Sequence, residues 1–390
     1  MKLLFYRYNS ICEPDLIEAF QASGFEVMEE CYEIKTKLVA PATRIKIIEK
    51  HFNCEKPQIV FSINFFPDIA EICHIYSVPY LCWTVDSPVP ELFSRAITYD
   101  TSHIFLFDYE QYLRFSPYNP DRIQYLPLGA NVRRFDRVVS SITTKERTCF
   151  HHDISFVGSL YTEKSPIQNV SGISEYTKGF IHGIATPALK LYGINFIEPS
   201  LTTQVIHDIK SHAPNFYHLP DAVEEMDAYV VAHQYVGNYI TEAERIQTLN
   251  LLASKFDVHL YTRSDTSSLT NVKIHNGVDS LSTMPKILHL SKINLNMTSK
   301  PIISGLPLRI FDIMGCGGFV MSNYQYEIPE YFEIGIDLET YGSMEELVDK
   351  CSYYLSHEEQ RKQIALNGHE KVCANHTYYH RIAKMLKTMM

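Results

Sequence analysis

The sequence lacks several features that define broad classes of protein. It has no run of the roughly 20 apolar residues that a membrane-spanning helix needs. Its first residues, MKLLFYRYNSICEPD, reach polar positions too soon to form the core of a signal peptide. Its nine cysteines form no Cys-x-x-Cys pair and no Cys/His cluster at metal-ligand spacing. We therefore expect a cytoplasmic protein with reduced thiols, no membrane span and no bound metal.

An excess of positive charge is also missing. The 35 Lys and Arg residues against 45 Asp and Glu give a formal charge of −10, which argues against nucleic acid as a partner. Tryptophan occurs once, but there are 26 Tyr and 21 Phe. Such a composition suits clefts in which a ligand stacks on aromatic rings, and it suits a packed core equally well. Because single cores stop growing at about 250–300 residues, a chain of 390 residues predicts two domains.

The first third of the chain alternates between β-branched or aromatic runs and amphipathic stretches. This alternation is typical of βαβ units and a parallel sheet. Strands are predicted at Lys2–Tyr6, Ile59–Ile63, Tyr80–Trp83, His103–Phe107 and Ile123–Leu126. Helices are predicted between them at Pro14–Ala22, Ala42–His51 and Pro67–Tyr76. The pattern predicts one doubly wound α/β domain.

A second α/β series follows residue 150. Its predicted strands are Asp153–Val157, Val258–Tyr261, Val272–His275, Ile293–Asn296 and Phe319–Ser322. Its predicted helices are Leu308–Met314, Met344–Leu355, Glu358–Cys373 and Tyr378–Lys387. Ligands of open α/β sheets bind outside the carboxyl ends of the strands, so function is expected in the loops that follow them.

Two segments do not fit the alternation. Asn131–Cys149 is polar and poor in periodic apolar positions, which predicts a linker. Tyr161–Arg245 is longer than a crossover needs and mixed in character, which predicts an insertion. We expect a first domain at residues 1–132, completed by a C-terminal helix at 375–390. The second domain is expected at 150–374, with a helical insertion at about 163–245.

Residues 304–318, SGLPLRIFDIMGCGG, are the most informative stretch. Pro307 fits the first turn of a helix, and Gly305 lets the backbone approach a ligand closely. The start of a helix favours anions because its N–H groups are free and its dipole is positive there. Arg309 and Asp312 stand one turn apart on the polar stripe, which matches a diphosphate followed by a ribose diol. The alternative is an Arg–Asp surface pair that contributes little to stability.

Several segments carry a family resemblance. They are INLNMT, LRIFDIMGCGGFVMS and SMEELVDKCSYYL between residues 293 and 355, DISFVGS at 153–159, and more loosely TVDSP and IQYLPLGAN. These segments resemble the GT-B glycosyltransferases, most of all the CgeB-type (spore-maturation-like) enzymes, over most of the chain outside 165–241. The resemblance implies two Rossmann-like doubly wound parallel-sheet domains facing a cleft. The N-terminal domain would hold an acceptor and the C-terminal domain a nucleotide-sugar.

Carried over by position, the resemblance implies that Asp312 binds the ribose hydroxyls, and that Arg309 and the Gly305 backbone bind the phosphates. Many retaining enzymes of this fold have two glutamates eight residues apart. Here Ser304 and Asp312 occupy those positions, which puts that mechanism in doubt. At the positions where the family has Gly-Arg and a later Lys, this chain has Gly158, Ser159 and Lys164. Lys164 could alternatively be a solvated side chain. The donor side is predicted to comprise Gly158, Ser159, Lys164, Tyr261, Arg263, Asn276, Gly277, Val278, Ser304, Gly305, Leu306, Arg309 and Asp312.

Two of these loops carry groups whose chemistry suits a nucleotide diphosphate. Arg263 follows a predicted strand, and a guanidinium can bind two diphosphate oxygens at once. Backbone groups at Asn276–Val278 could hold the edge of a base such as uracil, although a glycine after a strand is by itself weak evidence.

Asp86 in WTVDSP is the predicted catalytic residue of the first domain. A carboxylate just beyond a buried strand is placed to deprotonate an acceptor hydroxyl as a general base. Its alternative role is to cap the next helix. The acceptor-side candidates are Tyr8, Asn9, Asn64, Phe65 and Asp108. Tyr8, Asn9 and Phe65, with Tyr109, could form an aromatic platform for a sugar, or the aromatic rings could simply belong to the core.

No Asp-x-Asp pair occurs in the chain, so the resemblance implies a donor site that needs no metal and no other cofactor. The first hypothesis is a glycosyltransferase of the hexosyltransferase class. It would move a sugar from a nucleotide donor, UDP-linked by preference, to a glycan, glycolipid or protein acceptor. The alternatives are a nucleotide-sugar epimerase, or an inactive nucleotide-sugar sensor or partner subunit. The helix with Arg44, Lys46 and Lys50 either makes peripheral contact with anionic lipid or is an ordinary solvated face.

Overall fold

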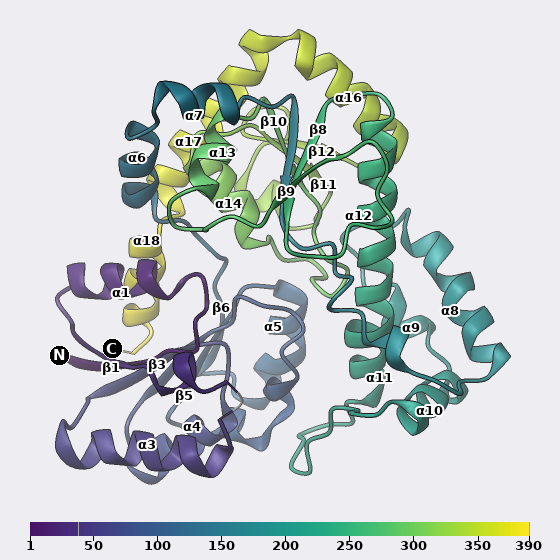
Figure 1. The fold of residues 1–390 in the computed structure, drawn as a ribbon. Coiled ribbons are helices and arrows are strands. Elements are labelled where there is room, and N and C mark those ends of the chain that lie inside the picture. Colours follow the sequence, from purple (N-terminus) through teal and green to yellow (C-terminus); the bar gives the residue numbers. More distant parts are fainter. Residues whose placement is uncertain (38, 390) are drawn as a thin grey trace. The chain divides into compact units, whose positions relative to one another are not determined.

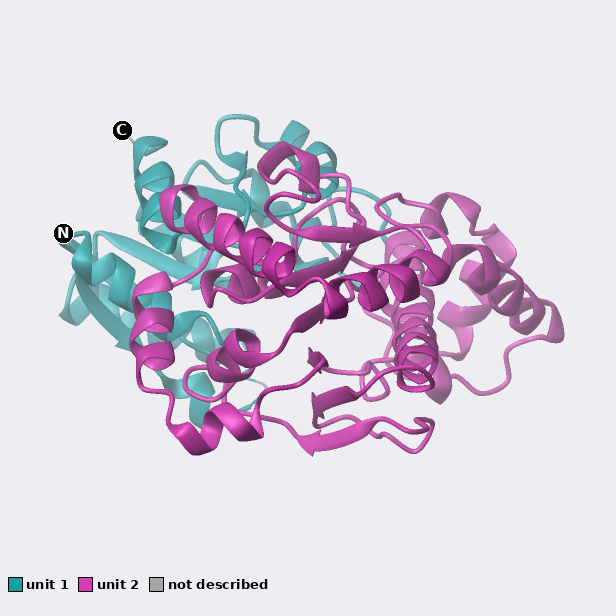
Figure 2. Ribbon diagram, turned by 90° about the horizontal axis from the view of Figure 1, so that it is seen from above, with its two compact units in different colours: residues 1–128, 218–226, 377–390 teal, residues 129–217, 227–376 magenta. Residues whose placement is uncertain are grey.

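The computed structural model describes residues 1–37 and 39–389, and these divide into two compact units. Figure 2 colours the two units separately. Unit 1 comprises residues 1–128, 218–226 and 377–390, and unit 2 comprises residues 129–217 and 227–376. The helix predicted at 375–390 ends on Met390, which lies outside the described residues.

Unit 1 is built on a six-stranded parallel sheet with strand order β2-β1-β3-β4-β5-β6. The strands are β1 Lys2–Tyr6, β2 Glu26–Glu30, β3 Ile59–Ile63, β4 Tyr80–Trp83, β5 Ser102–Leu106 and β6 Ile123–Tyr125. Strands β3, β4 and β5 are buried at every position, as expected for parallel strands covered on both faces. The sequence missed only β2, a charged edge strand of sequence EVMEE.

Helices cover this sheet, and the last of them comes from the far end of the chain. They are α1 Glu13–Ala22, α2 Tyr32–Lys35, α3 Pro41–Cys54, α4 Pro67–Ile75, α5 Tyr109–Phe115 and α18 Tyr378–Lys387. Helix α18 packs beside α1 (Figure 1). The Arg381 guanidinium donates to the Leu128 carbonyl at 2.8 and 3.0 Å. The single tryptophan, Trp83, is buried edge-on to Tyr378. The C-terminal helix is therefore an integral part of unit 1.

Unit 2 contains a second six-stranded parallel sheet, with strand order β12-β11-β10-β7-β8-β9. The strands are β7 Ile154–Val157, β8 Val258–Thr262, β9 Lys273–Asn276, β10 Ile293–Asn296, β11 Val320–Asn323 and β12 Glu339–Tyr341. The two sheets confirm the predicted pair of Rossmann-like domains. The short edge strand β12 was not predicted.

The two faces of the second sheet differ in chemistry. Alternate residues of β7, β8 and β10 enter one apolar cluster that includes residues of α12 and α16. The other residues of these strands include Ser155, His259 and Asn294, which are buried and polar. Helices α13 and α14 contact the sheet, and α17 packs against α14 (Figure 1). Polar groups therefore occur inside this half of the molecule as well as at its loops.

The helices of unit 2 include an extended helical segment between β7 and β8. They are α6 Val132–Ser140, α7 Thr144–Cys149, α8 Glu175–Ala188, α9 Ile197–Ser200, α10 Thr203–His212, α11 Asp227–Val230, α12 Asn238–Ala253, α13 Met284–Leu290, α14 Leu308–Gly315, α15 Ile328–Tyr331, α16 Met344–Ser356 and α17 Glu358–Asn375. A π-helical turn, Val231–Gly237, joins α11 to α12. No helix of the described residues has the length and apolarity to cross a membrane.

The predicted linker at residues 131–149 is wrong, because the segment folds as α6 and α7. The Asn131 side chain accepts from the Arg134 N–H at 3.1 Å, and Thr143 and Glu146 form a reciprocal capping box. Phe135 is buried, lying where a Cβ on Gly315 would come within 2.9 Å of its ring. Local capping and one buried aromatic ring thus make helices of a segment that is mostly polar.

Candidate functional site

The loop after β7 brings backbone and hydroxyl groups to the carboxyl end of the second sheet. The Gly158 N–H donates to the Tyr261 carbonyl at 3.1 Å, which continues the pairing of β7 with β8. The Ser159 hydroxyl accepts from the Tyr161 N–H at 2.8 Å and donates to Glu163 at 2.6 Å. These contacts fix the loop. Lys164 is exposed, and its ammonium lies 4.9 Å from the centre of the Tyr161 ring.

Arg245 of α12 is a candidate site residue that the sequence did not reveal. Its guanidinium donates to the Ser159 carbonyl at 2.7 Å and to the Met297 carbonyl at 2.5 Å, so it joins the loops after β7 and β10. Its Nε is buried and has no hydrogen-bond partner among the described residues. Burial lowers the pKa of Arg245, against the opposing effects of Tyr161 and Glu244, which raise it. A buried guanidinium therefore lies at this end of the sheet, beside the loops after β7 and β10.

The loops after β8 and β9 meet through Arg263 and Gly277. A Cβ placed on Gly277 would lie 2.5 Å from Arg263 Cγ, so the Arg263 stem crosses this glycine. The Arg263 and Asn276 side chains are exposed, and Val278 is half-buried. Tyr261 is engaged elsewhere, since its hydroxyl lies 2.7 Å from His152 Nε2. The structure therefore brings the predicted residues at 263 and 277 together and leaves the Tyr261 side chain outside that group.

Helix α14 begins at Leu308 as predicted, but Pro307 lies just before its first turn rather than in it. Pro307 is the N-cap residue, with extended backbone, and Leu308 is the first residue of the helix. An Arg309 NH1 to Asp312 Oδ2 distance of 3.2 Å confirms that the two side chains lie one turn apart. The Arg309 side chain is 21% exposed and that of Asp312 8%. The pair is formed without ligand, so a bound ribose would have to share Asp312 with Arg309.

Ser304 occupies the position where the resemblance leads one to expect a glutamate. Its hydroxyl donates to Glu327 Oε1 at 2.7 Å, and both side chains are buried. Glu327 is the residue before α15, far along the chain, and nothing in its local sequence marks it. Gly305 and Leu306 are buried beside Ser304. The structure thus supplies a carboxylate from another element next to the position that lacks one.

A polar network holds the loops after β10 and β11. Asn296 Nδ2 donates to the Thr298 hydroxyl at 3.0 Å and to the Ser322 hydroxyl at 2.9 Å. The Thr298 N–H donates to Asn323 Oδ1 at 2.8 Å. All four residues are buried. Satisfied networks of this kind rigidify the backbone above them, which here leads into residues 299–307.

In unit 1, Asn64 joins the predicted catalytic residue, Asp86, to the predicted acceptor-side residue Tyr8. Its Nδ2 donates to Asp86 Oδ2 at 2.7 Å and to the Tyr8 hydroxyl at 2.9 Å. Its Oδ1 accepts from the Val85 N–H at 3.0 Å and from the Asp86 N–H at 3.3 Å. Burial, and then the charge of Asp86, raise the pKa of Tyr8. Asp86 is exposed and contacts Asn64, and the nearest helical turn after it has Val89 as its N-cap.

Three comparisons relate the chain to known proteins. Residues 243–387 match the family model described as "Glycosyl transferase-like". Three solved structures share the fold at low identity. Anabaena HepE, in complex with UDP and glucose, has a TM-score of 0.56 and 11% identity over 100% of both chains. A glycosyltransferase from Rickettsia africae has a TM-score of 0.54 and 12% identity, over 99% of this chain and 97% of that one.

The third solved structure is a Listeria monocytogenes protein named as a UDP-N-acetylglucosamine 2-epimerase. It has a TM-score of 0.51 and 11% identity, over 100% of this chain and 96% of that one. No curated protein sequence gave a match.

The chain has the GT-B fold, and its residues 243–387 match a glycosyltransferase-like family. The family match confirms the predicted enzyme class, and the solved structures confirm the predicted fold. The CgeB-type subfamily stays a prediction. The family match spans α12 to α18, and so it includes both Arg245 and Asp312.

Two side chains predicted on the acceptor side, Phe65 and Asp108, are buried, and this corrects the prediction for them. Phe65 is buried against Tyr80, whereas Phe66 lies edge-on to Tyr8, because Asn64 adopts a left-handed conformation (φ 56°) that breaks the strand alternation. Asp108 is fully buried, and its carboxylate accepts from the Glu110 N–H at the start of α5. Asn9 is an exposed turn residue at φ 76°.

The cationic face predicted on α3 is also smaller than expected. Arg44 is buried, pairs with Asp68 and Glu33, and donates to the Tyr6 hydroxyl at 2.8 Å. Lys46 and Lys50 are exposed. Two exposed lysines are an ordinary solvated face, so the prediction of lipid contact loses its third cation.

Proposed function

We propose that this glycosyltransferase moves a sugar from a UDP-sugar to the hydroxyl of an acceptor. The observation that carries the proposal is Arg245, whose guanidinium joins the loops after β7 and β10, while Arg309 lies in the first turn of α14. Cations at the loops after the strands and at the helix start would stabilise a bound diphosphate. The UDP complex of Anabaena HepE, which shares the fold, supports UDP as the nucleotide.

The transfer exchanges one bond to the sugar for another. The bond from the sugar's anomeric carbon to the diphosphate oxygen breaks, and its electron pair leaves with UDP. The acceptor oxygen bonds to the same carbon, and its proton passes to a base. Arg309, Arg245 and the free N–H groups at the start of α14 would stabilise the charge that develops on the diphosphate. Since fixed cations supply this charge, the proposed reaction places no metal on the diphosphate.

In the proposed division of roles, unit 2 binds the donor and unit 1 supplies the base. Asp86 is the candidate base because its carboxylate is exposed and is oriented by Asn64 at 2.7 Å. The Asn64 amide orientation follows from its own contacts, since its oxygen accepts from two backbone N–H groups. Asn64 is therefore a positioning residue. The acceptor is a hydroxyl of a glycan, glycolipid or protein.

We expect Asp312→Asn to weaken UDP binding by about 10- to 100-fold, because it removes a charged acceptor for the ribose hydroxyls. The same change releases Arg309 from its 3.2 Å ion pair. Pyrophosphate, which has no ribose, should then bind as well as before or more tightly. Isothermal titration calorimetry with UDP and with pyrophosphate measures both effects. Unchanged UDP affinity would show that the ribose does not bind at α14.

Arg309→Gln should give a different pattern of ligand binding. Because it removes a cation from the diphosphate, it should weaken UDP and pyrophosphate together, by about 10-fold or more. Lys362→Gln is the matched control, since Lys362 is a 63% exposed cation of the same unit that pairs with Glu358. If Arg309→Gln binds both ligands like the control, Arg309 does not contact the phosphates.

Measurements of turnover distinguish the three functions considered for this fold: glycosyltransferase, epimerase and sensor. A glycosyltransferase releases UDP only as sugar appears on an acceptor or in water, whereas an epimerase converts the donor sugar without acceptor. A sensor binds the donor and changes neither. A thermal-shift panel of UDP-, GDP-, CDP- and dTDP-sugars selects the donor first, because a ligand that binds only the folded state raises its stability.

A further inference from the structure

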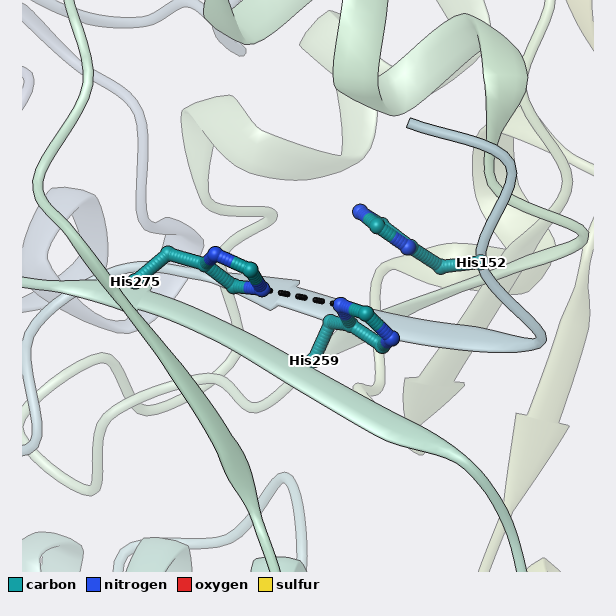
Figure 3. Close-up of side chains that lie close together, drawn as sticks. All are labelled: His152, His259 and His275. Carbon is teal, nitrogen blue, oxygen red and sulfur yellow. Dashed lines mark hydrogen bonds between the residues drawn. The ribbon is translucent and has the colours of Figure 1, made fainter. Parts of the chain in front are cut away.

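Three histidines converge on the polar face of the second sheet, outside the donor loops. His152 precedes β7, His259 is the second residue of β8, and His275 lies in the edge strand β9 (Figure 3). They come from three separate segments of the chain, so no ligand spacing appears in the sequence. One ring nitrogen from each of the three lies within 4.8 Å of the others.

The three rings are already in mutual contact. His259 Nδ1 lies 2.9 Å from His275 Nε2, the contact drawn as a dashed line in Figure 3. The rings of His152 and His259 stack with centroids 3.6 Å apart. A zinc–nitrogen bond of about 2.0–2.1 Å places two tetrahedral ligand nitrogens about 3.3 Å apart. To bind one ion, the stacked rings would turn so that one nitrogen of each faces it, and His152 Nε2 would keep or exchange its 2.7 Å contact with the Tyr261 hydroxyl.

The surroundings of the three histidines favour uncharged imidazole rings and place a carboxylate beside one of them. His152 and His259 are buried, and burial favours the uncharged form of an imidazole. His259 Nε2 lies 3.4 Å from Asp257 Oδ2. A carboxylate on the outer nitrogen of a histidine is the usual support of a metal ligand, since it leaves the other nitrogen to face the ion. His275 lies on an edge strand whose neighbouring residues are exposed, which gives an ion a route in.

We propose that His152, His259 and His275 together bind one divalent transition-metal ion, with zinc as the best match. Neutral imidazole nitrogens suit zinc and disfavour magnesium or calcium, which prefer oxygen. Three protein ligands leave one position for water. The ion would replace the His259–His275 hydrogen bond with two stronger bonds, and would tie the edge strand β9 to β8 and to the segment before β7.

The proposed site has a structural role that does not depend on the proposed transfer. Most of β9 is exposed, and it is paired only along one side, to β8. The loop at Asn276–Val278 begins directly after His275. Fixing β9 therefore fixes the start of that loop. Zinc binding is measured without donor or acceptor, so its result bears on this site alone.

The proposal is tested by measuring the zinc content of the protein after it has been stripped with a chelator, reloaded with zinc and desalted. We expect one zinc per chain for the wild-type protein, a rise in its melting temperature with zinc but not magnesium, and the visible spectrum of a tetrahedral ion with cobalt. His275→Gln should lower zinc affinity by at least about 10-fold, and so should Asp257→Asn, which removes only the outer support. His182→Gln, an exposed histidine of α8 in the same unit, is the control.

Asp257→Asn keeps the test decisive if His275→Gln does not fold, because the Asp257 side chain is 41% exposed. A wild-type protein that keeps no zinc after desalting would overturn the proposal. So would a His275→Gln or Asp257→Asn protein that binds zinc as tightly as His182→Gln.

Discussion

Asp86→Asn should lower kcat by about 100- to 10,000-fold, the range expected when a positioned general base is removed. Asparagine keeps the shape of the side chain and can accept a hydrogen bond from Asn64, but it cannot take the acceptor proton. Asp86 is exposed and lies outside the unit to which we assign the donor. UDP affinity should therefore stay within about twofold of wild type. Steady-state transfer and UDP titration together measure the split between kcat and binding.

Two further variants make this prediction specific. Asp100→Asn removes a carboxylate of the same unit that is 81% exposed, and it should leave kcat unchanged. Asn64→Ala removes the amide that orients Asp86, so it should lower kcat by less than Asp86→Asn does. If Asp86→Asn turns over like Asp100→Asn, the base is another group, and the contact between Asn64 and Asp86 is only structural.

The strands that the sequence predicted most accurately include ones that are buried at every position. Ile59–Ile63, Tyr80–Trp83 and Ile293–Asn296 were predicted with their observed bounds, because a continuous apolar or β-branched run has few other uses in a soluble domain. The two strands that were missed lie at sheet edges. Glu26–Glu30 carries three glutamates and is half exposed, so its sequence resembles that of a loop.

The residues of the candidate site also differ in how far the sequence could predict them. Residues 304–312 could be predicted because a helix start, with its proline and following Arg–Asp pair, is local in sequence. Arg245 and Glu327 could not, because their importance comes only from the carbonyl and hydroxyl groups they meet across the fold. The prediction placed Phe65 on the acceptor side, whereas Phe66 is the ring that lies beside Tyr8, and this error has a third cause. Strand alternation places a side chain correctly only until a residue such as Asn64 leaves the extended region.

Gly368→Ala is expected to lower the free energy of unfolding by about 1–3 kcal/mol, the usual cost of overpacking a core. Gly368 lies inside α17, where alanine would normally be favoured by about 0.5–1 kcal/mol. A Cβ there would lie 2.3 Å from the Asp337 carbonyl oxygen and 2.9 Å from Met314 Cε. The carbonyl belongs to the backbone, so α17 itself has to move. Urea unfolding measures the change.

The consequence should extend to the donor site, because Met314 belongs to α14, the helix whose first turns carry Arg309 and Asp312. At temperatures where the Gly368→Ala protein is folded, we expect weaker UDP binding than in wild type. Gly179→Ala is the matched control: Gly179 lies inside α8 of the same unit, and its added Cβ meets nothing within 4 Å. That variant should gain about 0.5–1 kcal/mol and bind UDP normally. Equal stability changes in the two variants would show that α17 can shift without disturbing α14.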